Sequence, residues 1–154
     1  MTSVAIIDYG VGNLFSLYQA VFKVGAQPKI TRDSSDILRS DCCILPGVGA
    51  FGSGIVKLRE LFLDEIIYEI IAKGIFLLGI CLGAQLLMEY SEEFGYHKGL
   101  GMISGHVEKI NCIPGFKIPY IGWGEIIMPE RTSRDWESSL FKDVLDRSEV
   151  YFVN

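Results

Sequence analysis

Cys81 stands at the centre of the pentapeptide Gly-Ile-Cys-Leu-Gly, residues 79–83. An apolar run, Ile75–Leu78, precedes this pentapeptide and a helical pattern, Ala84–Met88, follows it. Strand, sharp turn and helix with a nucleophile at the apex form a nucleophile elbow, here with cysteine in place of serine. The N–H groups and dipole at the start of a helix favour thiolate over thiol. The pattern indicates a cysteine nucleophile; the alternative is a cysteine that only fills a strand-to-helix junction.

A thiolate that attacks a carbonyl group also needs N–H donors for the oxyanion that forms. The backbone N–H of Leu82, directly after the nucleophile, is one candidate donor. A second donor could come from the loop Gly47-Val48-Gly49, because its glycines let the backbone turn an N–H toward the site. The alternative for this loop is an ordinary tight turn.

Composition excludes several other classes of protein. The chain has 154 residues, 49% of them hydrophobic and 21% charged, which is typical of one globular domain and argues against disorder. Its net charge of −5 comes without a cluster of lysine and arginine, so nucleic acid is a poor candidate partner. The most apolar stretch, Gly74–Met88, is shorter than the ~20 residues of a membrane helix. The four cysteines fit neither a disulfide framework nor a zinc site, and no secretory signal is visible, so we expect a reduced, cytoplasmic protein.

Apolar runs and helical patterns alternate along the first two thirds of the chain. This alternation predicts a doubly wound, mostly parallel sheet with helices on both faces. The ligand crevice of such a sheet lies beyond the C-terminal ends of its strands, where three glycine-rich junctions fall: residues 9–13, 46–49 and the elbow. The expected strands are Val4–Asp8, Lys29–Thr31, Cys42–Leu45 and Ile75–Ile80. The expected helices are Leu14–Val24, a brief helix through Arg39 that Asp33 or Ser34 caps, and Gly54–Lys73, which is broken near Phe62.

The pattern changes after Tyr90. Short candidate strands separated by glycine and proline predict a smaller, irregular antiparallel section after about residue 100. The candidate strands are Gly105–Ile110, Glu125–Met128 and the final run from Glu149, and a helix is expected within Asp135–Asp146.

Four motifs occur in one order: Ile-Asp-Tyr-Gly-Val-Gly-Asn at 7–13, Leu-Pro-Gly-Val-Gly-Ala-Phe at 45–51, Gly-Ile-Cys-Leu-Gly-Ala-Gln at 79–85 and Gly-Trp at 122–123. With them the chain resembles the class I glutamine amidotransferases, and within that class the glutaminase subunits of imidazole glycerol phosphate synthase. The resemblance covers essentially the whole chain. It implies a flavodoxin-like fold and a single glutamine amidotransferase domain over residues 1–154, truncated at its C-terminus.

The resemblance implies a definite reaction. Cys81 attacks the side-chain amide of glutamine, ammonia leaves, and water hydrolyses the resulting glutamyl thioester to glutamate. Gln85 and Glu93 match positions that contact the glutamine, and a carboxylate at Glu93 suits the α-ammonium. The alternative for Glu93 is one half of a solvated acidic pair with Glu92. The residues implied to hold the oxyanion are Gly47, Val48, Gly49 and Leu82.

Members of this family pass ammonia to a (β/α)-barrel cyclase with which they form a heterodimer. The cyclase makes imidazole glycerol phosphate and AICAR in histidine biosynthesis. Asn13 and Trp123 match positions at or near that interface, although Trp123 could also be a core residue. The resemblance implies no metal and no cofactor.

The sequence departs from the family at the general base. The family uses a histidine and a glutamate two residues apart near the end of a longer chain. The only histidines here, His97 and His106, match neither position, and we interpret them as ordinary surface or strand residues. We therefore expect an incomplete copy of a longer enzyme, with little glutaminase activity of its own, since general acid–base help is typically worth 10²–10⁴-fold.

Three further departures concern the surface that faces the partner. Tyr120 stands where the family commonly has histidine, Gly124 where it has asparagine, and Asn154 where it has histidine. These differences leave open a paralogous glutaminase that feeds a sugar-precursor amidotransferase in surface polysaccharide biosynthesis. A catalytically inactive binding subunit is another alternative. A cysteine hydrolase or redox protein of similar architecture is a further one, against which the paired motifs argue.

Overall fold

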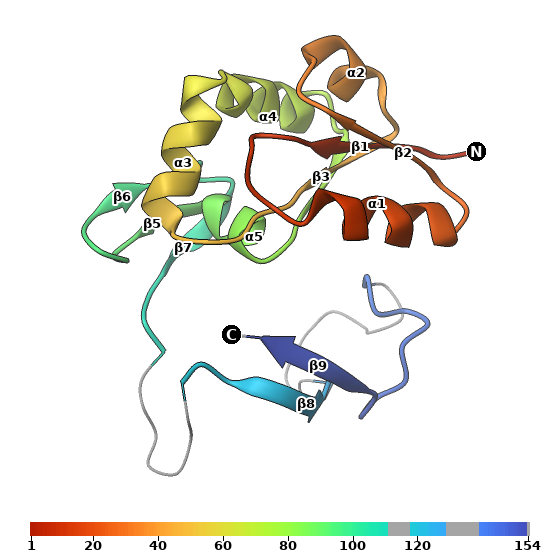
Figure 1. The fold of residues 1–154 in the computed structure, drawn as a ribbon, viewed down its shortest axis with the longest axis vertical. Helices are drawn as coiled ribbons and strands as arrows, with labels where there is room; N and C mark the ends of the chain where they lie inside the picture. The colour runs from red at the N-terminus through yellow and green to blue at the C-terminus, as the bar shows by residue number, and fades with distance from the viewer. Residues whose placement is uncertain (111–117, 129–138, 154) are drawn as a thin grey trace. The chain divides into compact units, whose positions relative to one another are not determined.

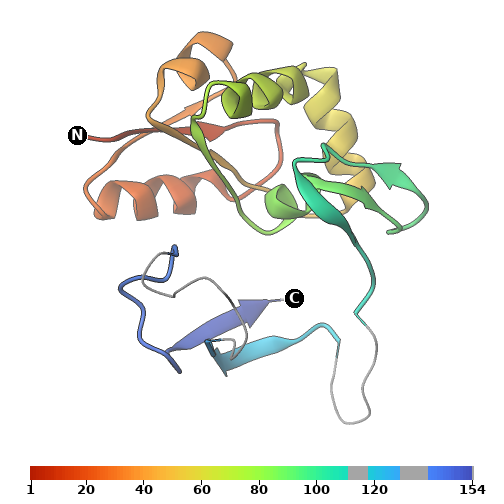
Figure 2. The same ribbon diagram turned by 180° about the vertical axis from the view of Figure 1, so that it is seen from behind.

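The computed structural model describes residues 1–110, 118–128 and 139–153, and the chain divides into two compact units, Met1–Lys109 and Ile110–Asn154. Figures 1 and 2 show the elements from opposite sides. The first unit contains β1 (Ser3–Ile7), α1 (Leu14–Lys23), β2 (Gln27–Thr31), α2 (Ser34–Arg39), β3 (Cys42–Leu45), α3 (Phe51–Glu60), α4 (Leu63–Ala72), β4 (Phe76–Gly79), α5 (Leu82–Leu86), β5 (Met88–Ser91), β6 (His97–Lys98) and β7 (Ile103–Val107); the second contains β8 (Ile121–Glu125) and β9 (Glu149–Val153).

A parallel sheet with the strand order β2-β1-β3-β4 forms the centre of the first unit. Its helices lie on both faces, with α1 on one side and α2 and α4 on the other (Figure 1). This confirms the predicted doubly wound architecture. In the register of the sheet Ile6 lies opposite Ile44, and Leu45 opposite Gly79, so β1, β3 and β4 end at the same edge.

Alternating side chains of β1 supply two separate hydrophobic cores, one on each face of the sheet, as the period of two in a strand requires. Ala5 and Ile7 point into the larger core, which contains buried residues of α2, α3, α4 and α5. Val4 and Ile6 point into the smaller core, where they meet Val21 of α1. Because both faces of β1 are covered, the strand is apolar from Val4 to Ile7.

The long helix expected from Gly54 to Lys73 is two helices, and the predicted break near Phe62 is confirmed. Phe62 adopts a left-handed backbone conformation with φ 56°, which ends the regular hydrogen bonding between α3 and α4. The expected start was wrong by three residues, since α3 begins at Phe51. Glycines at 52 and 54 weaken the helical signal in sequence, but burial of Phe51 and Ile55 stabilises that first turn.

The region after α5 differs from the expectation in detail. A second sheet, with the order β6-β5-β7, begins before residue 100, and β5 pairs parallel with β7 and antiparallel with β6. The predicted strand Gly105–Ile110 lies earlier, at Ile103–Val107.

In the second unit β8 and β9 form an antiparallel pair in which Trp123 lies opposite Tyr151. The expected strand Glu125–Met128 was wrong, because the strand there is Ile121–Glu125. The expected helix within Asp135–Asp146 falls partly outside the described residues, and its described part, 139–146, forms turns. Cys112 and Asn154 also lie outside the described residues.

Within the described residues, no helix combines the length and the apolar composition that a crossing of the bilayer requires.

Two isoleucines of α4 provide a test of the larger core. Ile67 is fully buried and Ile71 is 47% exposed on the same helix. We expect Ile67→Ala to lower the free energy of unfolding by about 2–5 kcal/mol, because a cavity replaces the lost side chain. Ile71→Ala should cost about 1 kcal/mol or less, since the neighbouring space is already open to water. Urea unfolding of both variants measures the difference, and equal losses would contradict this packing.

Candidate active site

Cys81 occupies a tight turn between β4 and α5, where its side chain is exposed. Its backbone has φ 53° and ψ −119°, a combination that non-glycine residues rarely adopt and that is typical of a strained turn at a functional site. Hydrogen bonds fix the turn on both sides: the Ile80 N–H donates to the Leu45 carbonyl at 3.0 Å, and the Gly83 N–H donates to the Ile80 carbonyl at 3.0 Å. The structure therefore has the predicted elbow geometry at this cysteine.

Two glycines flank Cys81 because strand and helix approach too closely for side chains. A Cβ on Gly83 would collide with the carbonyl oxygen of Leu45, at the end of β3. A Cβ on Gly79 would lie 2.6 Å from the Cα of Ala84. The helix that follows has five residues and begins at Leu82, two residues before the expected pattern Ala84–Met88.

The loop after β3 packs directly against the elbow. Gly47 is buried, and a Cβ there would lie 2.8 Å from Leu82 Cβ and 2.9 Å from the backbone nitrogen of Gly83. Val48 and Gly49 are exposed, and Gly49 has φ +99°. Within the part of the chain that the structure describes, no hydrogen bond occupies the backbone N–H groups of Val48, Gly49 or Leu82. The structure thus brings the predicted loop to the nucleophile with N–H donors available.

Tyr9 lies beside this loop and was missed by the sequence analysis. The residue is buried, and its hydroxyl donates a hydrogen bond of 2.8 Å to the Pro46 carbonyl. Burial, and to a smaller extent the negative charge of Cys81, raises the pKa of Tyr9 to about 12. The signal in sequence was available, since Tyr9 opens one of the three glycine-rich junctions.

Gln85 and Glu93 line one cavity of about 560 Å³ in the first unit. Gln85 lies one helical turn after Cys81, since its N–H donates to the Cys81 carbonyl at 3.1 Å. The structure therefore brings together the two residues predicted to bind glutamine. The remaining lining residues are Glu92, Phe94, Val107, Glu108 and Lys109, so carboxylates outnumber cations around this cavity.

One oxygen of Glu93 has a structural partner. Glu93 Oε2 accepts a hydrogen bond of 2.7 Å from the backbone N–H of Phe51, the first residue of α3. This interaction ties the carboxylate to the start of the helix that follows the glycine loop. From sequence, Glu93 was expected either to contact the substrate or to form a solvated pair with Glu92, and this hydrogen bond is a third role.

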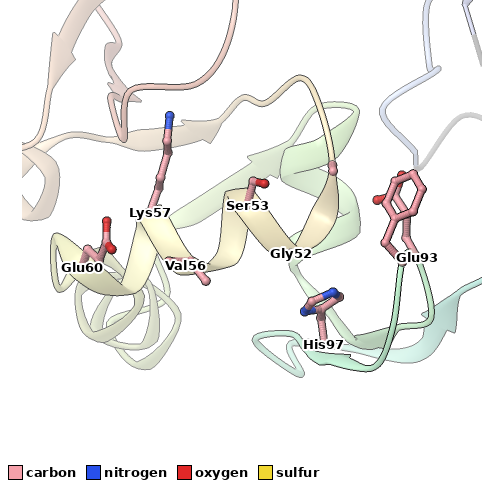
Figure 3. A pocket seen from close by; sticks show the side chains of 9 residues that line it. Gly52, Ser53, Val56, Lys57, Glu60, Glu93 and His97 are labelled. Atoms are coloured by element: carbon pink, nitrogen blue, oxygen red, sulfur yellow. The ribbon is translucent and has the colours of Figure 1, made fainter.

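A second cavity, of about 550 Å³, lies on the outer side of α3 (Figure 3). Ser53, Lys57 and Glu60 reach it from α3, while Glu93 and His97 reach it from the segment after β5 (Figure 3). Cys81 lines neither this cavity nor the one at Gln85. Glu93 is thus shared between the two cavities.

Neither histidine contacts Cys81 among the described residues. The His97 ring packs on Gly52, where a Cβ would lie 2.6 Å from its Cε1 atom. His106 stacks on Tyr90 with ring centroids 4.8 Å apart, and its Nε2 lies 3.7 Å from Glu108. Within residues 1–110, 118–128 and 139–153, no group of histidine, cysteine and acidic side chains could hold a metal ion.

The other cysteines that the structure describes, Cys42 and Cys43, are free thiols with raised pKa values. Cys43 is buried, and this burial raises the pKa of its thiol to about 11. Burial, followed by the charge of Asp41, also raises the pKa of Cys42. Both side chains therefore stay protonated near neutral pH. Because the thiolate and not the thiol is the reactive form, these two cysteines react poorly.

The two residues predicted for a partner interface lie in different units. Asn13 is exposed in the first unit and caps α1, because its Oδ1 accepts a hydrogen bond of 3.3 Å from the Ser16 N–H. Trp123 in β8 is 66% exposed and meets the ring of Tyr151 edge-on, with centroids 5.5 Å apart. The tryptophan is therefore no core residue of its own unit.

Residues 5–146 match the family model described as glutamine amidotransferase class-I. Together with the elbow, the glycine loop and the parallel sheet, this match shows that the chain belongs to the class I glutamine amidotransferase family.

Within the family the chain is similar to subunits named imidazole glycerol phosphate synthase subunit HisH. It is 42% identical to the subunit from Helicobacter hepaticus, over 98% of this chain and 73% of the relative. It is 43% identical to one from Bacillus cereus, over 98% of this chain and 68% of the relative. It is 41% identical to the subunit from Thermosynechococcus vestitus, over 99% of this chain and 70% of the relative.

A solved structure of a peptidase E protein from Listeria monocytogenes shares the fold with a TM-score of 0.54. The identity is 14%, over 66% of this chain and 63% of that one. At this identity the likeness concerns the fold alone.

The contact at Gly83 can be tested by adding one methyl group. We expect Gly83→Ala to lower the free energy of unfolding by about 1–3 kcal/mol or more, because the Cβ would displace the carbonyl of Leu45. Gly122→Ala is the control, since the nearest atom to a Cβ there is 4.0 Å away and the change should cost about 0.5 kcal/mol or less. Urea midpoints compare the two, and a silent Gly83→Ala would contradict the close approach.

Proposed function

We propose that this chain is the glutaminase subunit of an imidazole glycerol phosphate synthase, in which Cys81 hydrolyses glutamine and the ammonia passes to a cyclase partner. One observation carries the proposal: the only exposed cysteine of the described residues stands in an elbow, against a glycine loop with free N–H donors. The names of the relatives, HisH subunits of that synthase, support the same reaction.

In the proposed mechanism the Cys81 thiolate attacks the side-chain carbonyl carbon of glutamine. The carbonyl oxygen becomes an oxyanion, which the N–H of Leu82 and one N–H of the Gly47-Val48-Gly49 loop stabilise. The amide nitrogen takes a proton and leaves as ammonia, and water then releases glutamate from the thioester. Oxyanion donors favour the transition state over the bound substrate, because negative charge develops on the carbonyl oxygen only as the thiolate adds.

The cavity at Gln85 and Glu93 suits the amino-acid end of the substrate. An α-ammonium group needs carboxylate, and Glu92, Glu93 and Glu108 supply negative charge around the cavity. Lys109 supplies the positive charge that an α-carboxylate needs. Gln85 lies one helical turn from Cys81, and this proximity supports a glutamine bound in the cavity with its side chain directed toward the thiol.

We also propose that the general base comes from outside these 154 residues. Both histidines of the sequence are placed against other groups, His97 on Gly52 and His106 on Tyr90. The chain spans 68–73% of the length of the two HisH relatives from Bacillus cereus and Helicobacter hepaticus, so those proteins extend beyond the matched part.

For the partner we propose a (β/α)-barrel cyclase, bound as a heterodimer. Trp123 is exposed and large enough to anchor an interface, and Asn13 is exposed at the start of α1.

Alkylation tests the proposed nucleophile. The diazoketone analogue of glutamine should label Cys81 in the complete gene product at pH 8, and glutamine should protect it. Cys42 and Cys43 should stay unlabelled, because their pKa values are raised by burial. Peptide mass spectrometry identifies the labelled cysteine. In the presence of the partner, Cys81→Ala should lose glutamine hydrolysis by on the order of 10⁴-fold or more.

Cys42→Ala is the matched control and should keep its activity. The proposed function fails if Cys81→Ala still hydrolyses glutamine, or if the analogue labels the other cysteines equally.

Glu93→Gln tests the proposed seat of the α-ammonium. The amide oxygen can still accept the Phe51 N–H, so the start of α3 keeps its hydrogen bond while the negative charge is lost. We expect KM for glutamine to rise about tenfold or more, with a smaller change in kcat. Glu65→Gln, which removes an exposed carboxylate on α4 outside both cavities, is the control, and steady-state kinetics give both constants. An unchanged KM in Glu93→Gln would place the ammonium elsewhere.

A further inference from the structure

Tyr9 reaches the glycine loop from a different strand. It follows β1, whereas the loop follows β3, and the two strands pair in parallel with Ile6 opposite Ile44. Three residues further along the chain from each of these, just beyond the ends of both strands, Tyr9 and Gly47 lie side by side. The Tyr9 ring is 1% exposed, and its hydroxyl donates to the Pro46 carbonyl at 2.8 Å.

This hydrogen bond acts on the peptide that leads into the loop. The Pro46 carbonyl and the Gly47 N–H belong to one planar peptide unit and point in opposite directions. A donor that holds the carbonyl therefore also fixes the direction of that N–H.

Gly47 is confined from the other side as well. A Cβ there would collide with the Tyr9 hydroxyl and would lie 2.8 Å from Leu82 Cβ. The first peptide of the loop thus lies between the tyrosine and the elbow helix.

The tip of the loop has no such support. Val48 is 53% exposed, and a Cβ on Gly49 would meet no atom within 4 Å. The Pro46–Gly47 peptide, the root of the loop, is held in place, whereas Val48 and Gly49 at the tip are open to solvent. The direction of the N–H groups at Gly47 and Val48 therefore depends on how the Pro46–Gly47 peptide is held.

We propose that Tyr9 is a positioning residue for the oxyanion: its hydrogen bond to Pro46 holds the root of the loop so that a loop N–H faces the substrate carbonyl at Cys81. This inference rests on the proposed glutaminase function. Tyr9 does not touch the substrate and acts through the Pro46–Gly47 peptide alone.

Tyr9 can serve this purpose at every pH at which a glutaminase operates. Since burial raises its pKa to about 12, the phenol keeps its proton and remains a donor. For the same reason Tyr9 is not the base that takes the proton of Cys81.

Tyr9→Phe removes the hydroxyl and keeps the ring. Tyr68→Phe is the matched control, because the Tyr68 hydroxyl donates a hydrogen bond of 2.9 Å to a different carbonyl, that of Leu100. Both variants are made in the complete gene product with its partner. We expect Tyr9→Phe to lose about tenfold or more in kcat with KM changed less than about threefold, since the oxyanion forms only after binding. Tyr68→Phe should keep both constants.

Hydrogen exchange of the peptide containing residues 46–50 gives a readout that needs no activity. Exchange there should increase in Tyr9→Phe and stay unchanged in Tyr68→Phe. Unchanged exchange in Tyr9→Phe overturns the inference, as does faster exchange with an unaltered kcat. A fall in kcat that Tyr68→Phe reproduces would reveal a general loss of stability and would also overturn it.

The two hypotheses fail in different ways. If the unaltered protein does not hydrolyse glutamine, the proposed function fails and the positioning role fails with it. The unaltered protein could instead be active and depend on Cys81 while Tyr9→Phe has the same kcat. In that case only the role of Tyr9 is overturned.

Discussion

The start of α5 lies so close to the end of β3 that no side chain fits between them. Gly83 in α5 packs against the carbonyl of Leu45 at the end of β3. In the same way, Gly79 at the end of β4 packs against the backbone of Ala84 in α5. This approach forces Cys81 into the turn with φ 53°, a conformation that costs of order 1–3 kcal/mol. Burial of Leu82 and Leu86 in the main core offsets that cost, since an apolar side chain contributes about 1.5–3 kcal/mol when it is fully buried. The exposed thiol is therefore held by packing beneath it.

The parallel register then determines what meets this cysteine. Because β1, β3 and β4 lie side by side and end at one edge, their glycine-rich junctions converge there. The sequence was sufficient for this conclusion: buried apolar runs separated by helices predict a parallel sheet, and such sheets bind at their C-terminal edge. The role of Tyr9 could not be reached in the same way. Its contact with Pro46 depends on which residue of β1 faces which residue of β3, and the two partners are 37 positions apart.

Prediction was weakest where the elements are short and their partners distant in sequence. β6 has two residues, and β5 pairs with β7 through an irregular register, so neither strand leaves a clear period of two. β8 was misplaced because Gly122 and Gly124 look like turn residues, while in the structure they alternate with exposed Ile121 and Trp123. At the site, the resemblance to the family indicated Gln85 and Glu93, but it did not indicate the hydrogen bond that the Phe51 N–H donates to the Glu93 carboxylate.

That hydrogen bond joins two parts of the site that the sequence presents separately. Residues 46–51 run from the end of β3 into α3, and they are held at both ends: the Pro46 carbonyl by Tyr9 and the Phe51 N–H by Glu93. Glu93 also lines the cavity that suits an α-ammonium. A cation bound in this cavity and the Phe51 N–H would both interact with the Glu93 carboxylate. The two interactions are therefore linked through one side chain. The segment that contains the glycine loop is thus coupled by a direct contact to the cavity lined by Gln85 and Glu93, and Val48 and Gly49 at its exposed tip are the part with freedom to respond.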